Sequence, residues 1–341
     1  MRMIRASLVP IEWHDGLSVY ASESFLRAVG DQYGWLGGFE ESGSQCCVLP
    51  FTVVRKAGLR MVRFRVETFP LGSGLAIDEE RVFLRSAMAY FRSIGADLVI
   101  PASTNAIFRT YPEGAAAVPY GTYIVDLSQS EENLWGQVSA SHRRQIRLAM
   151  KAGVQIRQAP ERVEVAFELV RNTFGKFALP FMDLMSFKKY VAGLGDNVRI
   201  MIADYSGEVQ GCIVVPFSAH SAYYVYGGSI PGAHPGAMHL MHWEAIRLFR
   251  GLGTKLYDFV GVRINPERGS KQEGLMMFKE RFGGRLVEGF LWKYPIHPIA
   301  YRLYALAARL RSGGDIVDNE LKKLARSVDV RREGLPGCGK G

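Results

Sequence analysis

Short apolar stretches typical of strands alternate along the chain with amphipathic stretches typical of helices, and the order of these stretches repeats once. The stretches GWLGGFE (34–40) and CCVLPFTVV (46–54) flank one Ser-Gly pair, and VRIMIADY (198–205) and CIVVPFSAH (212–220) flank another. Apolar runs of this length on either side of a turn dipeptide are typical of β-hairpins. SGSQCCVLPF and SGEVQGCIVVPF also share their Ser-Gly, Gln, Cys and Pro-Phe positions, with an insertion of two residues in the second.

A second repeated unit follows each hairpin. FRSIGADLV (91–99) and FRGLGTKLY (249–257) both read F-R-x-x-G-x-x-L, and they lie 158 residues apart. In each unit an amphipathic helix stops at a glycine suited to a left-handed cap, Gly95 or Gly253, and a short apolar strand follows. Because both pairs of matches occur in the same order, we interpret the chain as an internal duplication rather than as two unrelated α/β segments.

The duplication predicts an α/β (α+β) protein with two tandem domains of the same kind. Each half contains helices, then several antiparallel strands, then a strand–loop–helix–strand crossover, which predicts a mixed, mostly antiparallel sheet flanked by helices. Asp126 ends a predicted strand, and Ser130 followed by two glutamates is typical of a helix N-cap. We therefore predict an N-terminal domain over 1–125, a C-terminal domain over 126–297, and basic C-terminal helices with a tail over 298–341.

Composition indicates the compartment. The 341 residues are 48% hydrophobic and 22% charged, which is typical of a globular chain. No apolar run is long enough to span a membrane, and the start MRMIRASLVPIEWHDG has too few apolar positions for a secretory segment. We therefore expect a cytoplasmic protein. Cys46 and Cys47 are adjacent, Cys212 and Cys338 stand alone, and no pair has CxxC spacing, so neither disulfides nor a cysteine-bound zinc is predicted.

The formal net charge of +9 favours a polyanionic partner, a class that includes nucleic acid, a phosphorylated donor and an anionic membrane surface. The segment 139–157 holds five Lys or Arg residues and no acid, although a solvated helix face is the competing explanation.

The stretch IAYRLYALAARLR carries an apolar stripe among basic residues, formed by Ile299, Leu303, Leu306 and Leu310. Docking on the chain's own surface or a partner, and peripheral membrane contact, both stay open for this stripe.

A glycine- and proline-rich loop over 230–236 precedes a predicted helix that begins near Ala237. The backbone N–H groups of Gly236 and Ala237 at the start of that helix are candidates for binding the phosphates of a donor such as acyl-CoA. A tight turn without a ligand is the alternative, because the sequence is neither a Walker motif nor GxGxxG. We predict no metal site, since no acid at a known zinc spacing accompanies the nearby histidines His234, His239 and His242.

Two stretches resemble one known family. The first, from Tyr257 to Gly284, reads YDFVG, then a polar loop, then GLMMFK and FGG. It resembles the Fem family of non-ribosomal peptidyltransferases and its relatives with a GNAT-like acyltransferase domain, in which a YDFGG strand precedes a G-hydrophobic-x-x-FK-x-x-FGG element. Val260 stands where a glycine is usual. The second stretch, DLSQSEENLWGQVSASHRRQIRLAMKAGVQI, is similar to the family's arginine segment, and the resemblance covers about residues 125–295.

The resemblance implies two tandem GNAT-like domains and an N-acyltransferase. Members of the family move an aminoacyl group from charged tRNA onto an amine of a cell-wall precursor peptide, and others in the wider group use acyl-CoA or act in polysaccharide pathways. The implied donor is therefore aminoacyl-tRNA or acyl-CoA, the implied acceptor is a cell-envelope precursor, and no permanently bound cofactor is implied. Lys279 matches the family's FK lysine, which is expected to contact a phosphate or the reacting carbonyl. Arg143 and Arg144 match its arginine segment.

Other polar residues of the second half are candidates on their own chemistry. Asp258 lies on an apolar strand, so its carboxylate is either paired inside the protein or turned into a cleft as a general base or orienting group. Arg263 and Lys271, in the loop after that strand, are candidates for an anion-binding rim, although a wet loop carries such charges without a ligand. For Tyr226 the alternatives are orientation of the substrate and core packing. A solvated helix lysine is the alternative for Lys279.

In the first half, Arg60, Arg63 and Arg65 alternate on a predicted strand face and are candidates for meeting an anionic acceptor, but they match no family motif. The leading hypothesis is a Fem-like N-acyltransferase that acts on a cell-envelope precursor. One alternative is an acyl-CoA-dependent GNAT-type N-acetyltransferase. The other is a non-catalytic nucleic-acid-binding protein, which rests on the net charge and the segment 139–157. The oligomeric state stays open.

Overall fold

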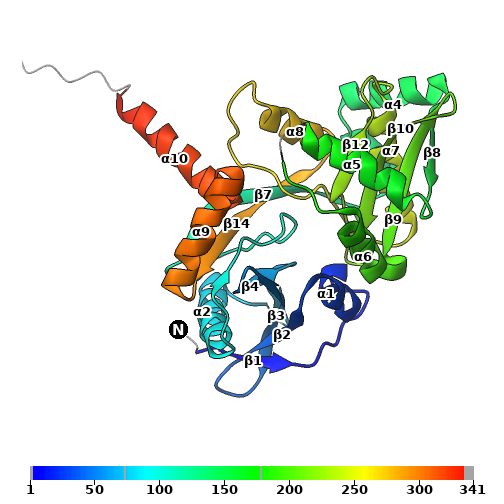
Figure 1. The fold of residues 1–341 in the computed structure, drawn as a ribbon. Coiled ribbons are helices and arrows are strands. Elements are labelled where there is room, and N and C mark those ends of the chain that lie inside the picture. Colours follow the sequence, from blue (N-terminus) through cyan, green and yellow to red (C-terminus); the bar gives the residue numbers. More distant parts are fainter. Residues whose placement is uncertain (1–2, 73, 177–178, 334–341) are drawn as a thin grey trace, which may run out of the picture.

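The computed structural model describes residues 3–72, 74–176 and 179–333, so the end of the predicted tail, with Cys338, lies outside the described residues. The first half of the chain contains η1 (Val19–Ala21), α1 (Glu23–Val29) and α2 (Ile77–Ser93). Its strands are β1 (Arg5–Val9), β2 (Gln32–Phe39), β3 (Gln45–Lys56), β4 (Leu59–Phe64), β5 (Phe69–Pro70), β6 (Leu98–Val99) and β7 (Ala116–Asp126). In Figure 1 this half runs from blue to cyan.

The second half begins with helices and continues with strands. Its helices are α3 (Glu131–Gln137), α4 (Ala140–Ala152), α5 (Val163–Gly175), α6 (Leu184–Leu194), η2 (Gly195–Asn197), α7 (Ala237–Gly251) and α8 (Lys271–Glu280). Its strands are β8 (Gln155–Gln158), β9 (Val198–Tyr205), β10 (Glu208–Pro216), β11 (Ser221–Tyr223), β12 (Tyr226–Ser229), β13 (Leu256–Asp258) and β14 (Arg285–Pro295). The helices α9 (Pro298–Ser312) and α10 (Ile316–Glu333) follow.

The described strands form two sheets. The larger has ten strands in the order β1-β2-β3-β4-β6-β14-β7-β13-β11, with β5 beside β3, and the smaller has the order β12-β10-β9-β8. Most neighbours are antiparallel, and the exceptions are the parallel pairs β4–β6 and β11–β13. Parallel neighbours need a long crossover, which α2 supplies in the first pair and α7 in the second. The predicted crossovers are therefore confirmed.

Both repeated sequence units adopt the predicted conformations. Gly95 after α2 has φ 75° and Gly253 after α7 has φ 78°, the left-handed conformation that glycine adopts without steric cost. The β2–β3 and β9–β10 hairpins turn at the two Ser-Gly pairs, where Gly43 has φ 84° and Ser206 and Gly207 have φ 52° and 82°. The helix–glycine–strand units and the hairpins of the two halves thus correspond.

Two long strands connect the halves, and they run through the middle of Figure 1. β14 pairs with β7 along its length, from Arg285 opposite Ile124 to Lys293 opposite Ala116, and its far end also pairs with β6 of the first half. β7 in turn pairs with β13 of the second half. One continuous sheet therefore joins both halves. The predicted boundaries at 125 and 297 fall near the ends of β7 and β14, and the division into domains itself stays a prediction.

A shared apolar cluster also joins the halves. The first half contributes Tyr20, Trp35 and Val66, and the second half contributes Tyr223 and Val260. Helix α1 of the first half packs against α6 of the second in the same region. Because the two halves bury apolar surface against each other, the polar groups at the edge of this cluster keep fixed positions relative to one another.

The C-terminal helices lie beside β14, as the orange and red helices of Figure 1 show. Lys293 Nζ of β14 is bonded to Asp315 at 2.9 Å and to Asp318 at 2.7 Å, and Val317 is buried in the core. The predicted stripe on α9 is exposed, at 66% for Ile299, 59% for Leu303, 56% for Leu306 and 82% for Leu310. The stripe therefore does not dock on the described part of the chain. No helix in that part is long and apolar enough to cross a membrane.

Candidate active site

The segment after β13 makes an unusual turn at the junction of the two halves. Val260 has φ 41° and Gly261 has φ 26°. A positive φ is uncommon outside glycine and is strained for a β-branched residue. A Cβ added at Gly261 would lie 2.8 Å from Cβ of Thr104, so this position requires glycine. Val260, the departure from the family pattern, thus holds a conformation that glycine adopts easily.

The side chain of Lys279 in α8 stabilises this turn. Its Nζ donates hydrogen bonds to the carbonyl oxygens of Val260 and Gly261, the second at 2.8 Å. The residue is only 8% exposed, so the interpretation of Lys279 as a solvated helix lysine is wrong. An ammonium has three N–H donors. Two of them stabilise the turn, which leaves one for a further acceptor.

Asp258 ends β13 directly before the turn. Its Oδ1 accepts hydrogen bonds from Thr122 Oγ1 and, at 2.7 Å, from the backbone N–H of Val260. Its Oδ2 accepts no hydrogen bond from a described residue, and it is not among the unpartnered atoms sealed from solvent in that part of the chain. Asp258 is only 5% exposed, so its carboxylate is largely buried, paired through one oxygen and without a hydrogen bond to a described residue at the other.

Burial shifts the pKa values of Asp258 and Lys279 toward neutral pH. Desolvation raises the pKa of Asp258 to about 6, although the hydrogen bonds from Thr122 and Val260 and the nearby Lys279 cation act to lower it. Desolvation lowers the pKa of Lys279 to about 8, although the Asp258 carboxylate acts to raise it. Between about pH 6 and pH 8 the two groups form a carboxylate and an ammonium that lie near each other. Perturbed pairs of this kind gather at functional sites.

Histidine and aromatic side chains pack around α8 and fix its position. The rings of Phe278 and Phe282 lie 4.8–5.5 Å, between centroids, from those of His142 and His242. Burial lowers the pKa of His142 to about 4 and that of His242 to about 3, so both are neutral at pH 7. These histidines therefore act in packing. Within the described ranges no group of three His, Cys, Asp or Glu side chains could hold a metal ion.

A row of charged residues at the end of β4 leads to Glu67, which lies near Asp258. Arg63, Arg65 and Glu67 alternate along β4 and the segment after it, and each is partly exposed while the residues between them are buried. Tyr226 of the second half is close to both arginines: burial raises the pKa of its hydroxyl, and the two guanidinium charges oppose this rise. The role of Tyr226 in orienting a substrate stays a prediction.

The arginine segment serves another helix. Arg143 Nη1 donates hydrogen bonds to three carbonyl oxygens near the end of α3, those of Trp135 at 3.3 Å, Gly136 at 3.0 Å and Val138. These are carbonyl groups that a helix end leaves without an internal partner, so the guanidinium caps α3. Arg144 is exposed on α4. Donor binding by either arginine stays a prediction.

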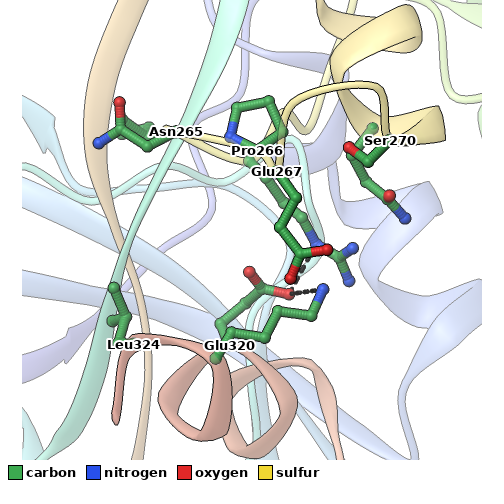
Figure 2. A pocket seen from close by; sticks show the side chains of 10 residues that line it. Asn265, Pro266, Glu267, Ser270, Glu320 and Leu324 are labelled. Carbon is green, nitrogen blue, oxygen red and sulfur yellow. Dashed lines mark ion pairs between the residues drawn. The ribbon is translucent and has the colours of Figure 1, made fainter. Parts of the chain in front are cut away.

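The charged loop after the turn packs against α10. Arg263 Nε forms an ion pair of 2.6 Å with Glu320, and Lys323 lies 3.6 Å from the same carboxylate. Figure 2 shows these ion pairs in a pocket of about 130 Å³ between the loop and the helix. Because Glu320 neutralises the charge of Arg263, this arginine is less suited to bind an anion than the predicted rim requires. Lys271 begins α8 and is exposed, and its binding role stays a prediction.

The predicted anion-binding loop before α7 is covered by α4. A Cβ added at Gly236 would lie 2.3 Å from the carbonyl oxygen of Gln145. The N–H of Gly236 donates to His234 Nδ1 at 3.3 Å, and the N–H of Ala237 donates to His234 O at 2.9 Å. Both N–H groups are therefore already bonded. Phosphate binding by Gly236 and Ala237 stays a prediction that this geometry does not favour.

Three polar residues around the turn were missed from the sequence: Thr104, Thr122 and Glu67. Thr122 lies 136 residues before Asp258 in the chain, and only the pairing of β7 with β13 brings them together. Glu67 carried one signal, since it continues the alternation of Arg63 and Arg65. Burial raises the pKa of Glu67 to about 8, and the nearby Asp258 carboxylate adds to the rise.

Comparisons with known proteins agree with this geometry. Residues 208–309 match the FemAB family, a range that contains both Asp258 and Lys279. A protein of Staphylococcus haemolyticus (strain JCSC1435) named lipid II:glycine glycyltransferase is 34% identical over 102 residues, which cover 27% of this chain and 23% of that protein. The chain thus spans about a quarter of the length of this curated relative.

The fold is shared more widely than the sequence. The crystal structure of FemX superposes with a TM-score of 0.66 at 14% identity, over 88% of this chain and 99% of that chain. At this identity the likeness concerns the fold, and the predicted α/β class with mixed, mostly antiparallel sheets flanked by helices is confirmed. The predicted resemblance to the Fem-type family is likewise confirmed, carried in sequence by residues 208–309 and in fold by most of the chain.

Proposed function

We propose that this protein is a Fem-type aminoacyltransferase that joins an aminoacyl group to an amine of a peptidoglycan precursor. The observation that carries the proposal is the pair formed by Asp258, with one carboxylate oxygen that has no hydrogen bond to a described residue, and Lys279, a buried ammonium beside a strained turn. The matched relative is named for glycyl transfer to lipid II, which supports a lipid II-type acceptor and an aminoacyl-tRNA donor. This chemistry requires no permanently bound cofactor.

The proposed reaction is a direct attack of the acceptor amine on the ester carbonyl of the donor. The new N–C bond forms, the amine proton goes to Oδ2 of Asp258, and the C–O bond to the tRNA ribose then breaks. The proton held by Asp258 passes to the ribose oxygen that leaves, so the carboxylate is regenerated. The remaining N–H of Lys279 stabilises the oxyanion of the tetrahedral intermediate. Because the amine attacks directly, no enzyme nucleophile is needed.

The test is a transfer assay with purified protein, radiolabelled aminoacyl-tRNA and lipid II as the acceptor. Labelled lipid II is the expected product. A parallel reaction with labelled acetyl-CoA tests the N-acetyltransferase alternative, which the bonded N–H groups of Gly236 and Ala237 make less favourable. Transfer from acetyl-CoA alone would replace the proposal by that alternative. Absence of transfer from both, with RNA binding that survives Lys279→Ala, would leave the nucleic-acid-binding alternative.

The pH dependence of transfer is expected to be bell-shaped. The rate rises through about pH 6, because Asp258 must be ionised to accept a proton, and it falls through about pH 8, because Lys279 must keep its proton to stabilise an oxyanion. The measurement is kcat/KM for the acceptor from pH 5 to pH 10 at constant ionic strength. A rate that rises steadily up to pH 10 would instead indicate that only the ionisation of the free amine matters.

We also propose that α9 contacts an anionic membrane surface, where a lipid-linked acceptor resides. Its apolar stripe is exposed in the described structure, and the helix sequence PIAYRLYALAARLRS holds three arginines and no acid. An exposed apolar face flanked by cations is complementary to an interface of anionic lipids.

The double variant Leu303→Ser/Leu306→Ser is expected to bind phosphatidylglycerol vesicles roughly tenfold or more weakly, since each leucine transferred from water contributes on the order of 1.5–3 kcal/mol. Co-sedimentation measures this binding. Leu148→Ser on α4, where the leucine is also exposed, is the matched control. Equal binding of the double variant and the natural protein, or equal binding to neutral phosphatidylcholine vesicles, would contradict the proposal.

A further inference from the structure

Arg63, Arg65 and Glu67 form a row of charges that the proposed chemistry does not use. They alternate with buried residues along the end of β4 and the segment that follows it, and Val66 between Arg65 and Glu67 packs in the apolar cluster that joins the two halves. Each retains partial exposure, and in each the pKa is shifted mainly by desolvation. The three side chains are therefore partly buried, and the surface that they line is called the recess below.

The two arginines lack an anionic partner. Nε of Arg63 and Nε of Arg65 are buried and donate to no partner among the described residues, and neither guanidinium forms an ion pair there. The one side-chain bond of this pair runs from Arg65 Nη2 to the carbonyl oxygen of Val29 at 3.2 Å. Burial, together with the adjacent Arg63 charge, lowers the pKa of Arg65 to about 9. An unpaired buried cation is costly unless an anion joins it.

Tyrosine hydroxyls surround the same two cations. Tyr226 lies near both arginines, and Tyr20 and Tyr190, whose hydroxyl oxygens are 3.1 Å apart, lie near Arg65. Guanidinium and phenol groups are donors that suit a carboxylate or a phosphate. The recess therefore has the chemistry of an oxyanion site formed by both halves of the chain.

The other end of the row is acidic and adjoins the catalytic pair. Glu67 follows Arg65 by two residues and lies close enough to Asp258 for that carboxylate to raise its pKa. The strand β4 ends at Phe64 and the chain bends at residues 65 and 66, so the two arginines and Glu67 follow one another around this bend. The recess thus places two guanidinium groups at one end and, at the other, a carboxyl group whose oxygen can accept a hydrogen bond from an amine.

We propose that Arg63 and Arg65 bind an oxyanion of the acceptor, a carboxylate or a phosphate, while Glu67 receives its amine next to Asp258. The proposal rests on the aminoacyl transfer proposed above and names the acceptor class: an amine that also carries an anionic group. Neither the anion nor the amine alone uses both ends of the recess.

Calorimetry with three small probes tests the site without any transfer reaction. The probes are 6-aminohexanoate, 6-aminohexyl phosphate and hexylamine, which lacks the anion. The natural protein is expected to bind at least one anionic probe tenfold or more tightly than hexylamine, and the tighter of the two distinguishes a carboxylate from a phosphate. Arg65→Gln is expected to abolish that preference while hexylamine binding stays unchanged. Arg55→Gln, at an exposed arginine of β3, is the matched control and is expected to keep the preference.

Thermal unfolding supplies a second readout that needs no variant. The melting temperature of the natural protein is expected to rise with the anionic probe and not with hexylamine, because only a ligand of the folded state stabilises it. Equal shifts with hexylamine, or an anionic preference that survives Arg65→Gln in a folded protein, would overturn the proposal. The discrimination persists even if the protein transfers no aminoacyl group, so this test and the transfer assay fail independently.

Discussion

Replacing Lys279 by methionine is expected to lower the rate of aminoacyl transfer roughly 10²–10³-fold, the loss typical of removing one oxyanion donor. Methionine keeps most of the buried volume but has no N–H groups. The variant removes the N–H proposed for the oxyanion and the two hydrogen bonds to Val260 and Gly261. The measurement is kcat at saturating donor and acceptor, with Lys255→Met, at an exposed lysine before β13, as the control.

The same variant separates chemistry from support of the turn. Loss of a charged donor from two buried carbonyl groups is expected to lower the free energy of unfolding by about 1–3 kcal/mol. Adding Val260→Gly relieves the strain at φ 41° but removes a side chain buried in the shared apolar cluster, and it is expected to recover no activity. If the double variant regains transfer, Lys279 acts only by positioning the turn. If Lys279→Met alone transfers at nearly the natural rate, the proposed role of the ammonium is wrong.

Replacing Asp258 by asparagine is expected to lower the rate roughly 10²–10⁴-fold while the protein stays folded. The amide oxygen can still accept the hydrogen bonds from Thr122 and Val260 that Oδ1 accepts now, so the turn keeps its support. The amide nitrogen in place of Oδ2 cannot accept a proton. The rise in rate through about pH 6 should disappear with the carboxyl group, and a pH–rate profile measures both effects.

Asp196→Asn, at an exposed aspartate of η2, is the matched control for this variant and is expected to leave the profile unchanged. A natural rate in Asp258→Asn would show that the carboxylate only organises the turn. A lost rate together with a lower melting temperature would be ambiguous, so the comparison requires equal unfolding curves for the two variants. Equal curves are expected because asparagine has nearly the shape of aspartate.

Several features of the fold could be predicted because short segments carry them. The hairpin turns at Gly43 and Gly207 and the helix ends at Gly95 and Gly253 follow from residues that tolerate a positive φ. Ser130 caps α3 as predicted, with its Oγ accepting from the N–H of Asn133 at 3.2 Å. Each of these signals involves residues that are neighbours in the chain, so no knowledge of distant contacts is needed.

The site itself was predicted only in part. Lys279 and Asp258 were found through the family resemblance and through an acid on an apolar strand. The contacts of Arg143 and Arg263 were not, because carbonyl groups at the end of α3 and Glu320 on α10 become their partners only in the folded chain. The sequence alone does not show whether a long cationic side chain binds a partner inside the protein or a ligand.

The duplicated local units, their turns and the FK segment can be predicted from the amino-acid sequence, since they depend on periodicity and on single residues with special backbone freedom. The three-dimensional fold was needed to show that β7 and β14 cross between the halves and place Thr122 beside Asp258. It was also needed to show that Glu67 adjoins that carboxylate and that Val260 has a strained φ. Strand pairing over more than a hundred residues depends on the packing of the whole core, which no local pattern encodes.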